Sequence, residues 1–95
     1  MSKRTSWSEL REELGVDRDH PAYSAARIAF ELGAEVRMLR ERRGWSQTEL
    51  ATRSGMTQSA MARFEAGGTV PTLPVLERIA TALGMRLSVA LTEAC

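Results

Sequence analysis

The stretch TQSAMAR, residues 57–63, holds the side chains best suited to recognition chemistry. The amide of Gln58 can form two hydrogen bonds to the N6 and N7 edge of adenine, and the guanidinium of Arg63 can do the same to O6 and N7 of guanine. Ser59 is a weaker, more versatile reader, and Ala62 could touch a thymine methyl group. The stretch therefore suits the reading of DNA base edges. The alternative is that Gln58 and Ser59 are ordinary polar residues on a helix surface.

Catalytic chemistry has little support in this sequence. His20 is the only histidine and Cys95 the only cysteine, and no metal-ligand spacing, phosphate-binding loop or nucleophile–base pair accompanies them. We therefore expect no enzymatic activity, no catalytic residue, no metal site and no cofactor. One thiol cannot form an internal disulfide, which suits the reducing cytoplasm.

Size and charge limit the remaining possibilities. The 95 residues suffice for one small domain with an appended arm, and the apolar fraction of 43% is ordinary for a globular protein. No run approaches the ~18 apolar residues of a membrane helix, and the N-terminus does not resemble a secretory signal. The net charge of +1 does not demand nucleic acid, but four arginines fall within seven residues. They are Arg37, Arg40, Arg42 and Arg43, which form either a solvated helix face or a basic contact surface.

Two short helices are expected to position the stretch. Residues 47–53 form the first and residues 57–66 the second, with a turn at 54–56. Ser46 and Thr57 are typical N-cap residues, and Glu49 would complete a capping box with Ser46. Gly55 can adopt the positive φ that such a turn requires. A small residue at the helix crossing and an apolar residue in the second helix complete a helix-turn-helix pattern: Ala51 and Met61.

A long helix is expected before this motif, over residues 21–43, ending at Gly44. Gly33 lies in its middle, at a cost of about 1 kcal/mol against alanine. The expected core stripe is Ala25, Ile28, Leu32, Val36 and Leu39. A second apolar stripe, which requires another partner, is Tyr23, Phe30 and Ala34. A further helix is expected over residues 73–83, with Gly84 as its C-terminal cap.

The two ends of the chain carry additional patterns. Residues 6–14 read as a short amphipathic helix with Trp7, Leu10 and Leu14 on one face. Residues 86–91 alternate apolar and polar side chains, which predicts a short β-strand. A lone strand has unpaired edges, so it would pair most simply with its own copy in a dimer.

Residues 36–84 resemble the lambda-repressor-like (XRE) helix-turn-helix family. The family pattern appears here as Leu39-Arg40, as Ser46, Gln47, Leu50 and Ala51, and as Glu65 and Gly67. The resemblance implies an all-α, lambda-repressor-like helix-turn-helix bundle, with an N-terminal helical arm and the short C-terminal strand appended. It divides the chain into an arm at 1–20, a DNA-binding domain at 21–84 with its motif at 47–66, and a strand and tail at 85–95.

The same resemblance implies roles for individual residues. Gln47 would bind a DNA phosphate together with the helix start at Ser46, and residues 57–63 would enter the major groove with Thr57 at its rim. Arg40 and Glu65 would form a structural salt bridge. The looser phosphate candidates are Arg42, Arg43, Arg53 and Thr69.

Three features around the motif resemble the HigA-type antitoxins of type II toxin–antitoxin modules: the arm with Trp7, the long helix at 21–43, and the final pattern of Gly84, Leu87 and Val89. This resemblance implies three partners. They are double-stranded operator DNA, a RelE/HigB-like mRNA-cleaving toxin, and a second copy of the chain. The candidate toxin contacts are Trp7, Leu10, Leu14, Tyr23 and Phe30. The alternatives are that the arm packs on its own long helix, that the chain is a stand-alone XRE-type repressor, or that it is a helical scaffold.

Overall fold

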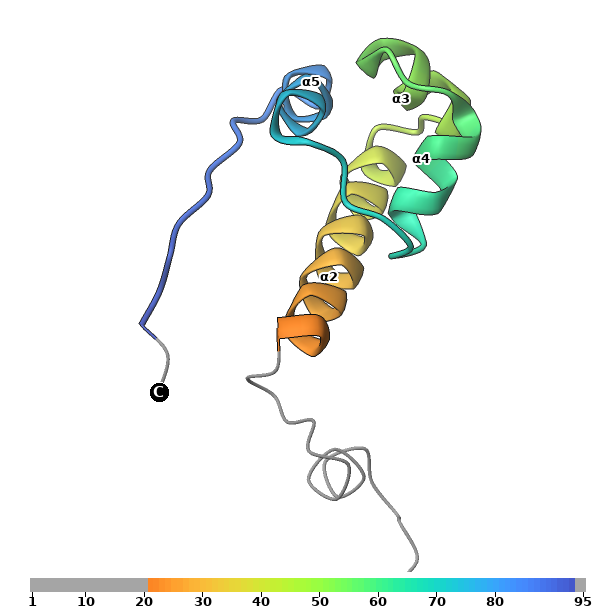
Figure 1. Ribbon diagram of the computed structural model, residues 1–95. Coiled ribbons are helices and arrows are strands. Elements are labelled where there is room, and N and C mark those ends of the chain that lie inside the picture. The colour runs from red at the N-terminus through yellow and green to blue at the C-terminus, as the bar shows by residue number, and fades with distance from the viewer. Residues whose placement is uncertain (1–20, 94–95) are drawn as a thin grey trace, which may run out of the picture.

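The computed structural model describes residues 21–93, and the chain folds there into four helices (Figure 1). The helices are α2 (Pro21–Arg42), α3 (Gln47–Ser54), α4 (Gln58–Glu65) and α5 (Leu73–Ala82). Each helix predicted within the described residues is therefore confirmed to within one residue at either end. The predicted arm helix, with Trp7, Leu10 and Leu14, lies outside the described residues.

The hydrophobic core lies between the C-terminal half of α2 and the three shorter helices. Its most buried side chains come from α3, α4 and α5: Leu50, Met61, Phe64 and Ile79. Helix α3 packs against both α4 and α5, while α2 packs against α4. The first turns of α2 extend away from this body, as Figure 1 shows. The C-terminal half of α2 thus belongs to the core, while its first turns project from the body.

The predicted core stripe of α2 is wrong in its N-terminal half. Val36 is buried, but Ala25 is exposed and Ile28 is 54% exposed. The face that is buried instead holds Ala29, Gly33, Val36 and Arg40. Leu32 and Leu39 only flank the core. The second stripe is largely exposed, with Phe30 63% exposed.

Gly33 explains which face of α2 turns inward. An ideal Cβ at this position would lie 2.2 Å from the carbonyl oxygen of Phe64. No real side chain tolerates that distance, so α4 can cross α2 this closely only where α2 has no side chain. The glycine in the middle of the helix therefore selects the buried face rather than merely weakening the helix.

Local capping follows the sequence closely. The Ser46 hydroxyl accepts a hydrogen bond from the Glu49 amide at 3.0 Å, and the Thr57 hydroxyl accepts one from Ala60 at 3.1 Å. Gly55 has φ of 71° at the end of α3. The carboxylate of Glu49 instead bonds Arg53 at 2.7 Å. The second half of the predicted capping box is thus not formed.

The predicted strand at residues 86–91 is absent from the part of the chain that the structure describes. Residues 85–93 have no regular secondary structure. A strand requires a second strand for its hydrogen bonds, and the described residues contain no other. Among these residues, no helix is long and apolar enough to cross a membrane.

Candidate nucleic-acid interface

The residues predicted to face DNA gather where α3 and α4 begin. Thr57, Gln58, Ser59 and Arg63 are exposed, and Ala62 is half-buried. The opposite side of α4 is fixed in the core by Met61 and Phe64, both fully buried, and by Glu65. One face of this eight-residue helix therefore holds the fold together while the other faces solvent.

A buried ion pair anchors this region. Arg40 Nε lies 2.7 Å from Glu65 Oε2, and Arg40 Nη2 lies 3.0 Å from Glu65 Oε1. The Glu65 side chain is 2% exposed and the Arg40 side chain 10%. The third contact of Arg40, from Nη1 to the Trp45 carbonyl at 2.7 Å, ties the α2–α3 loop to the pair. The guanidinium of Arg40 therefore makes its contacts within the protein.

The contacts with Glu65 favour the charged form of Arg40. Hydrogen bonds to Glu65 raise the pKa of Arg40 above its ordinary value, and they outweigh the opposing effect of its burial. A bidentate contact between a guanidinium and a carboxylate also fixes orientation, because both groups are planar. The carboxylate of Glu65 is therefore held still enough to orient a further residue.

That further residue is Gln47, the first residue of α3. Its Nε2 donates to Glu65 Oε1 at 3.1 Å, and its Oε1 accepts from Nε2 of Gln58 at 2.8 Å. A carboxylate can only accept, so Gln47 must direct its amino group toward Glu65 and its carbonyl oxygen toward Gln58. Gln58 must then spend one N–H on Gln47. The side-chain carbonyl oxygen and second N–H of Gln58 remain for another partner.

The contacts of these four residues form one chain, the Arg40–Gln58 network: Arg40, Glu65, Gln47 and Gln58. It runs from the core to an exposed amide. The family resemblance predicted the ion pair, but nothing in the sequence indicated that Gln47 and Gln58 meet, because they lie 11 residues apart on different helices. Their contact depends on the angle between α3 and α4.

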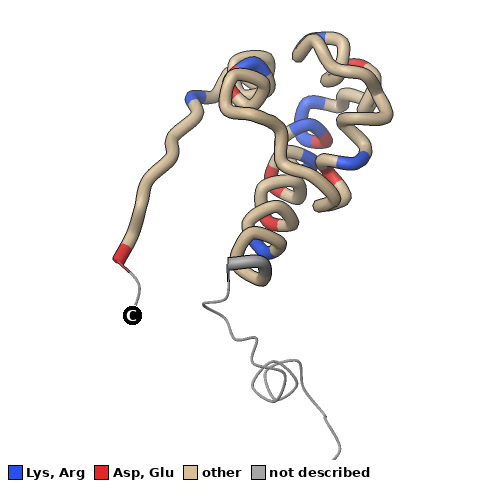
Figure 2. Tube along the Cα trace, viewed as in Figure 1, with Lys and Arg blue, Asp and Glu red and all other residues tan. Residues whose placement is uncertain are grey.

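The looser phosphate candidates differ in how they are engaged. Arg43 donates to the carbonyl oxygens of Leu39 and Leu83, which joins the ends of α2 and α5. Arg53 bonds Glu49 and stacks on the Trp45 ring at 4.2 Å. Arg42 and Thr69 are exposed. Basic and acidic residues are intermixed along the described chain (Figure 2).

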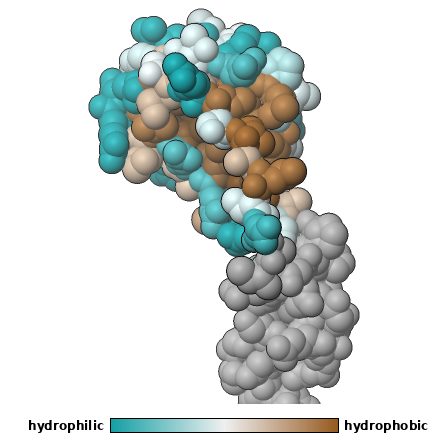
Figure 3. Space-filling model, turned by 90° about the vertical axis from the view of Figure 1, so that its left-hand side faces the viewer, coloured by the Kyte–Doolittle hydropathy of each residue, from teal (hydrophilic) through white to brown (hydrophobic). Residues whose placement is uncertain are grey.

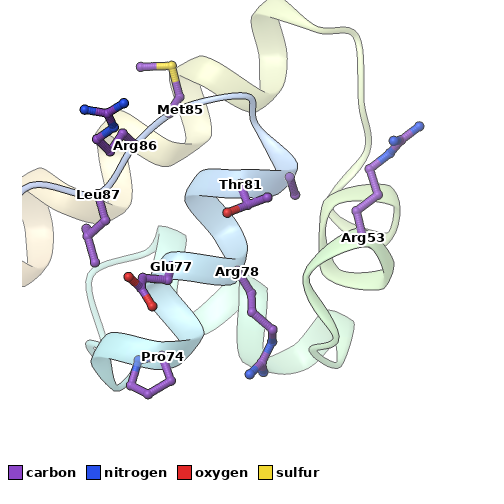
Figure 4. A pocket seen from close by; sticks show the side chains of 9 residues that line it. Arg53, Pro74, Glu77, Arg78, Thr81, Met85, Arg86 and Leu87 are labelled. Atoms are coloured by element: carbon purple, nitrogen blue, oxygen red, sulfur yellow. The ribbon is translucent and has the colours of Figure 1, made fainter.

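A separate open pocket of about 640 Å³ lies between α3, α5 and the residues after α5. Three arginines line it, but Figure 4 shows their side chains pointing in different directions: Arg53, Arg78 and Arg86. Arg78 instead caps the end of α3 by donating to the Ser54 carbonyl oxygen at 2.8 Å. The pocket thus lacks converging groups that would define a ligand site.

The candidate toxin contacts are only partly visible. Phe30 lies exposed on α2, and Tyr23 is half-buried near the start of the same helix. Trp7, Leu10 and Leu14 lie outside the described residues. In the described part of the chain, no group of His, Cys, Asp and Glu side chains could hold a metal ion.

The chain is similar in sequence to known helix-turn-helix proteins. The helix-turn-helix domain family matches residues 31–94. An uncharacterized HTH-type transcriptional regulator from Haemophilus influenzae is 33% identical over 85 residues, covering 90% of this chain and 84% of that protein. The chain spans about half the length (49%) of the vertebrate curated relatives that it matches.

Two solved structures are similar in fold and sequence. The restriction-modification controller protein C.AhdI from Aeromonas hydrophila has a TM-score of 0.61 and 32% identity, covering 63% of this chain and 91% of that chain. A chain of a toxin–antitoxin module from Streptococcus pneumoniae has a TM-score of 0.59 and 31% identity. That second likeness covers 96% of this chain and 97% of the other, well beyond the span of the family match.

Proposed function

The chain belongs to the helix-turn-helix domain family, and from this premise we propose that it is a sequence-specific DNA-binding transcription regulator. The family is non-enzymatic, which agrees with the expectation that the chain has no catalytic residue. The single observation that carries the proposal is the Arg40–Gln58 network, which presents the exposed amide of Gln58 from a fixed base. Such a regulator acts on DNA in the cytoplasm.

In the proposed complex the N-terminal turns of α4 enter the major groove. Gln58 pairs with adenine through the carbonyl oxygen and N–H that Gln47 leaves available, and Arg63 pairs with guanine. Ser59 and Ala62 contact neighbouring base edges, with Thr57 at the rim of the groove. The exposure of Gln58, Ser59 and Arg63 supports this assignment.

Phosphate contacts come from the start of α3 and from the loop after α4. The first N–H groups of α3 carry partial positive charge, which favours an anion beside Ser46 and Gln47. The second N–H of the Gln47 amino group is available for the same phosphate, since only one is used by Glu65. Thr69 is the exposed candidate beyond α4.

We also propose that the regulator is an antitoxin, which binds a RelE/HigB-like toxin and represses its own operon as a homodimer. The support is the likeness to a toxin–antitoxin module chain over nearly the full length of both chains. Trp7, Leu10 and Leu14 of the arm, together with Tyr23 and Phe30 of α2, are the proposed toxin contacts. The exposure of Phe30 agrees with this role.

A stand-alone repressor is the second candidate function. It is favoured by the 33% identity to an HTH-type transcriptional regulator and by the likeness to a controller protein. Both candidates share the α4 surface and differ only in the partner of the arm. Experiments on DNA and on the toxin therefore have to be separate.

The DNA proposal is tested by selecting binding sites from random duplexes with the purified chain and then measuring Arg63→Ala by fluorescence anisotropy. We expect Arg63→Ala to lose about 1–3 kcal/mol of binding free energy at the selected site and to relax the sequence preference at one base pair. Arg27→Ala is the matched control, because Arg27 makes only an exposed pair with Glu31 on α2. An equal loss on every sequence would make Arg63 a phosphate contact, and no selected site at all would refute the proposal.

The antitoxin proposal is tested by co-purification with the product of the neighbouring gene. A Trp7→Ala, Leu10→Ala double variant should lose that partner and retain operator binding. If the wild-type chain captures no toxin while it binds DNA, the stand-alone repressor is the correct function.

A further inference from the structure

The first turn of α3 contains a carboxylate that could close the start of the helix but does not. Glu49 lies three residues after the N-cap residue Ser46, the spacing at which a glutamate accepts a hydrogen bond from the N-cap amide. The carboxylate of Glu49 instead accepts from Nε of Arg53 at 2.7 Å. Within the described residues, the backbone amides of Ser46, Gln47 and Thr48 donate no hydrogen bond. The start of α3 therefore keeps open donors.

A tryptophan beside the helix holds Arg53 in this position. The Arg53 guanidinium lies 4.2 Å from the centre of the Trp45 ring, within the range of a cation–π contact. The Trp45 backbone is itself fixed by Arg40, through its amide at 3.3 Å and its carbonyl oxygen at 2.7 Å. The Arg53 and Glu49 side chains are 49% and 44% exposed, so their ion pair alone would constrain them little. The ring therefore adds the constraint that orients Arg53.

We propose that Arg53 is a positioning residue for the phosphate site at the start of α3. It holds the Glu49 carboxylate away from the Ser46 amide, so that this amide stays available to DNA. Without Arg53, the carboxylate turns to the amide and completes the capping box. The inference rests on the proposed DNA-binding function, and it names the residue that keeps the phosphate site open.

A carboxylate and a phosphate cannot both occupy the start of α3. Both are anions that accept hydrogen bonds from the same few N–H groups, and two negative charges in contact repel each other. The helix dipole attracts Glu49 to this place, because Glu49 lies in the first turn. Arg53 competes for it with a full positive charge one turn later. The position of one carboxylate therefore decides whether the chain itself or the DNA backbone caps α3.

The alternative is that Arg53 contacts a phosphate directly. Arg53 lies in the last turn of α3, six positions beyond Gln47, which corresponds to about 9 Å along a helix. Its Nε is used by Glu49, and one face of its guanidinium is covered by Trp45. The geometry thus favours an action through Glu49 over a direct contact.

Nuclear magnetic resonance of the free chain tests the position of Glu49. In Arg53→Ala, the Ser46 amide proton should shift downfield, because it gains a hydrogen bond to the carboxylate. The shift should disappear in the Arg53→Ala, Glu49→Ala double variant. Arg37→Ala is the matched control, because it breaks a similarly exposed pair with Glu41 four residues away on α2. An unchanged Ser46 amide in Arg53→Ala would overturn the proposal.

Operator binding tests the consequence for the phosphate site. Arg53→Ala should raise the dissociation constant about 10-fold, as expected for the loss of a hydrogen bond to a charged group. The loss should be equal on all sequences, because phosphate contacts carry no sequence information. Adding Glu49→Ala should return the constant to near its wild-type value. The Arg37→Ala and Glu41→Ala variants carry the same changes of charge and should show neither the loss nor the recovery.

Two outcomes separate this inference from the function on which it rests. If Arg53→Ala weakens binding and Glu49→Ala does not reverse the loss, Arg53 is a direct phosphate contact and the proposal is wrong. If the wild-type chain selects no DNA site, the DNA-binding proposal fails, whereas the Ser46 resonance still reports where Glu49 lies.

Discussion

Two faces of the molecule differ in how many of their groups find partners within one chain. One is formed by α3 and α4, and the other by α2 and the tail (residues 84–93). On the first face, the Arg40–Gln58 network joins four side chains through contacts of 2.7–3.1 Å. On the second, Val89 and Leu91 stand exposed and the tail backbone makes no hydrogen bonds beyond Met85 within the described residues. A preorganised surface is ready to recognise a ligand, whereas the second surface leaves apolar side chains exposed in the described residues (Figure 3).

The largest effect should follow from breaking the ion pair under the first face. Glu65→Ala leaves the Arg40 guanidinium buried without its carboxylate, so we expect a loss of about 3–5 kcal/mol in unfolding free energy. Urea denaturation measures it. A loss below about 1 kcal/mol would mean that Arg40 reaches water or another partner.

The matched double variant separates stability from recognition. Arg40→Met with Glu65→Leu replaces two charges with apolar groups of similar size and should recover most of the stability. It also removes the carboxylate that orients Gln47. The preference for the base that Gln58 contacts should therefore be weaker than in the wild-type chain. A double variant that regained full DNA discrimination would show that the network does not position Gln58.

The Gly33→Ala variant has the next largest expected effect on stability. The test is whether the substitution stabilises or destabilises the chain. Helix propensity alone predicts that alanine stabilises a helix interior by about 1 kcal/mol over glycine. The new Cβ would meet the Phe64 carbonyl oxygen at 2.2 Å, so we expect a loss of about 1–3 kcal/mol instead. Thermal unfolding distinguishes the two, with exposed Glu35→Ala on the same helix as control.

Gln47→Ala should have a smaller effect, visible mainly on DNA. The variant would lose the proposed phosphate contact and the support of Gln58, which should cost about 1 kcal/mol in affinity. The informative quantity is the coupling with Gln58→Ala: the two losses should not add, because each removes the same contact. Thr48→Ala, an exposed neighbour on α3, is the control. Additive losses would mean that the two glutamines act independently on DNA.

Local signals in the sequence were sufficient for the helices of the described residues and for their caps. Cap residues act within three or four positions, so Ser46 and Thr57 could be predicted as helix starts. The Arg40–Glu65 pair could be named only through the family resemblance, since residues 25 apart leave no local pattern. The DNA contacts at Gln58 and Arg63 remain predictions.

The errors arose where the structure depends on residues that lie far apart in the sequence. Apolar spacing placed Ile28 in the core, but the close crossing at Gly33 turned another face of α2 inward. Alternation predicted a strand at 86–91, but alternation supplies only side chains, while strand pairing requires a second backbone. Gly33 was the available sign, because a glycine in a helix interior leaves room for another backbone to approach closely.

The smallest expected effect on stability belongs to Phe30→Ala, on the projecting part of α2. Phe30 is 63% exposed and lies beside Gly67, so its removal should change unfolding free energy by less than about 1 kcal/mol. Leu50→Ala is the contrasting control, because its side chain is fully buried and its loss should cost about 2–5 kcal/mol.

The same Phe30 variant tests what covers the projection. If α2 contacts a toxin there, co-purification should fall while operator binding and the dimer are retained, since neither uses Phe30. If instead Phe30→Ala destabilises the isolated chain as much as Leu50→Ala, then Phe30 is covered within the chain itself. The arm would then be a structural element, and the second surface would be complete except at the tail.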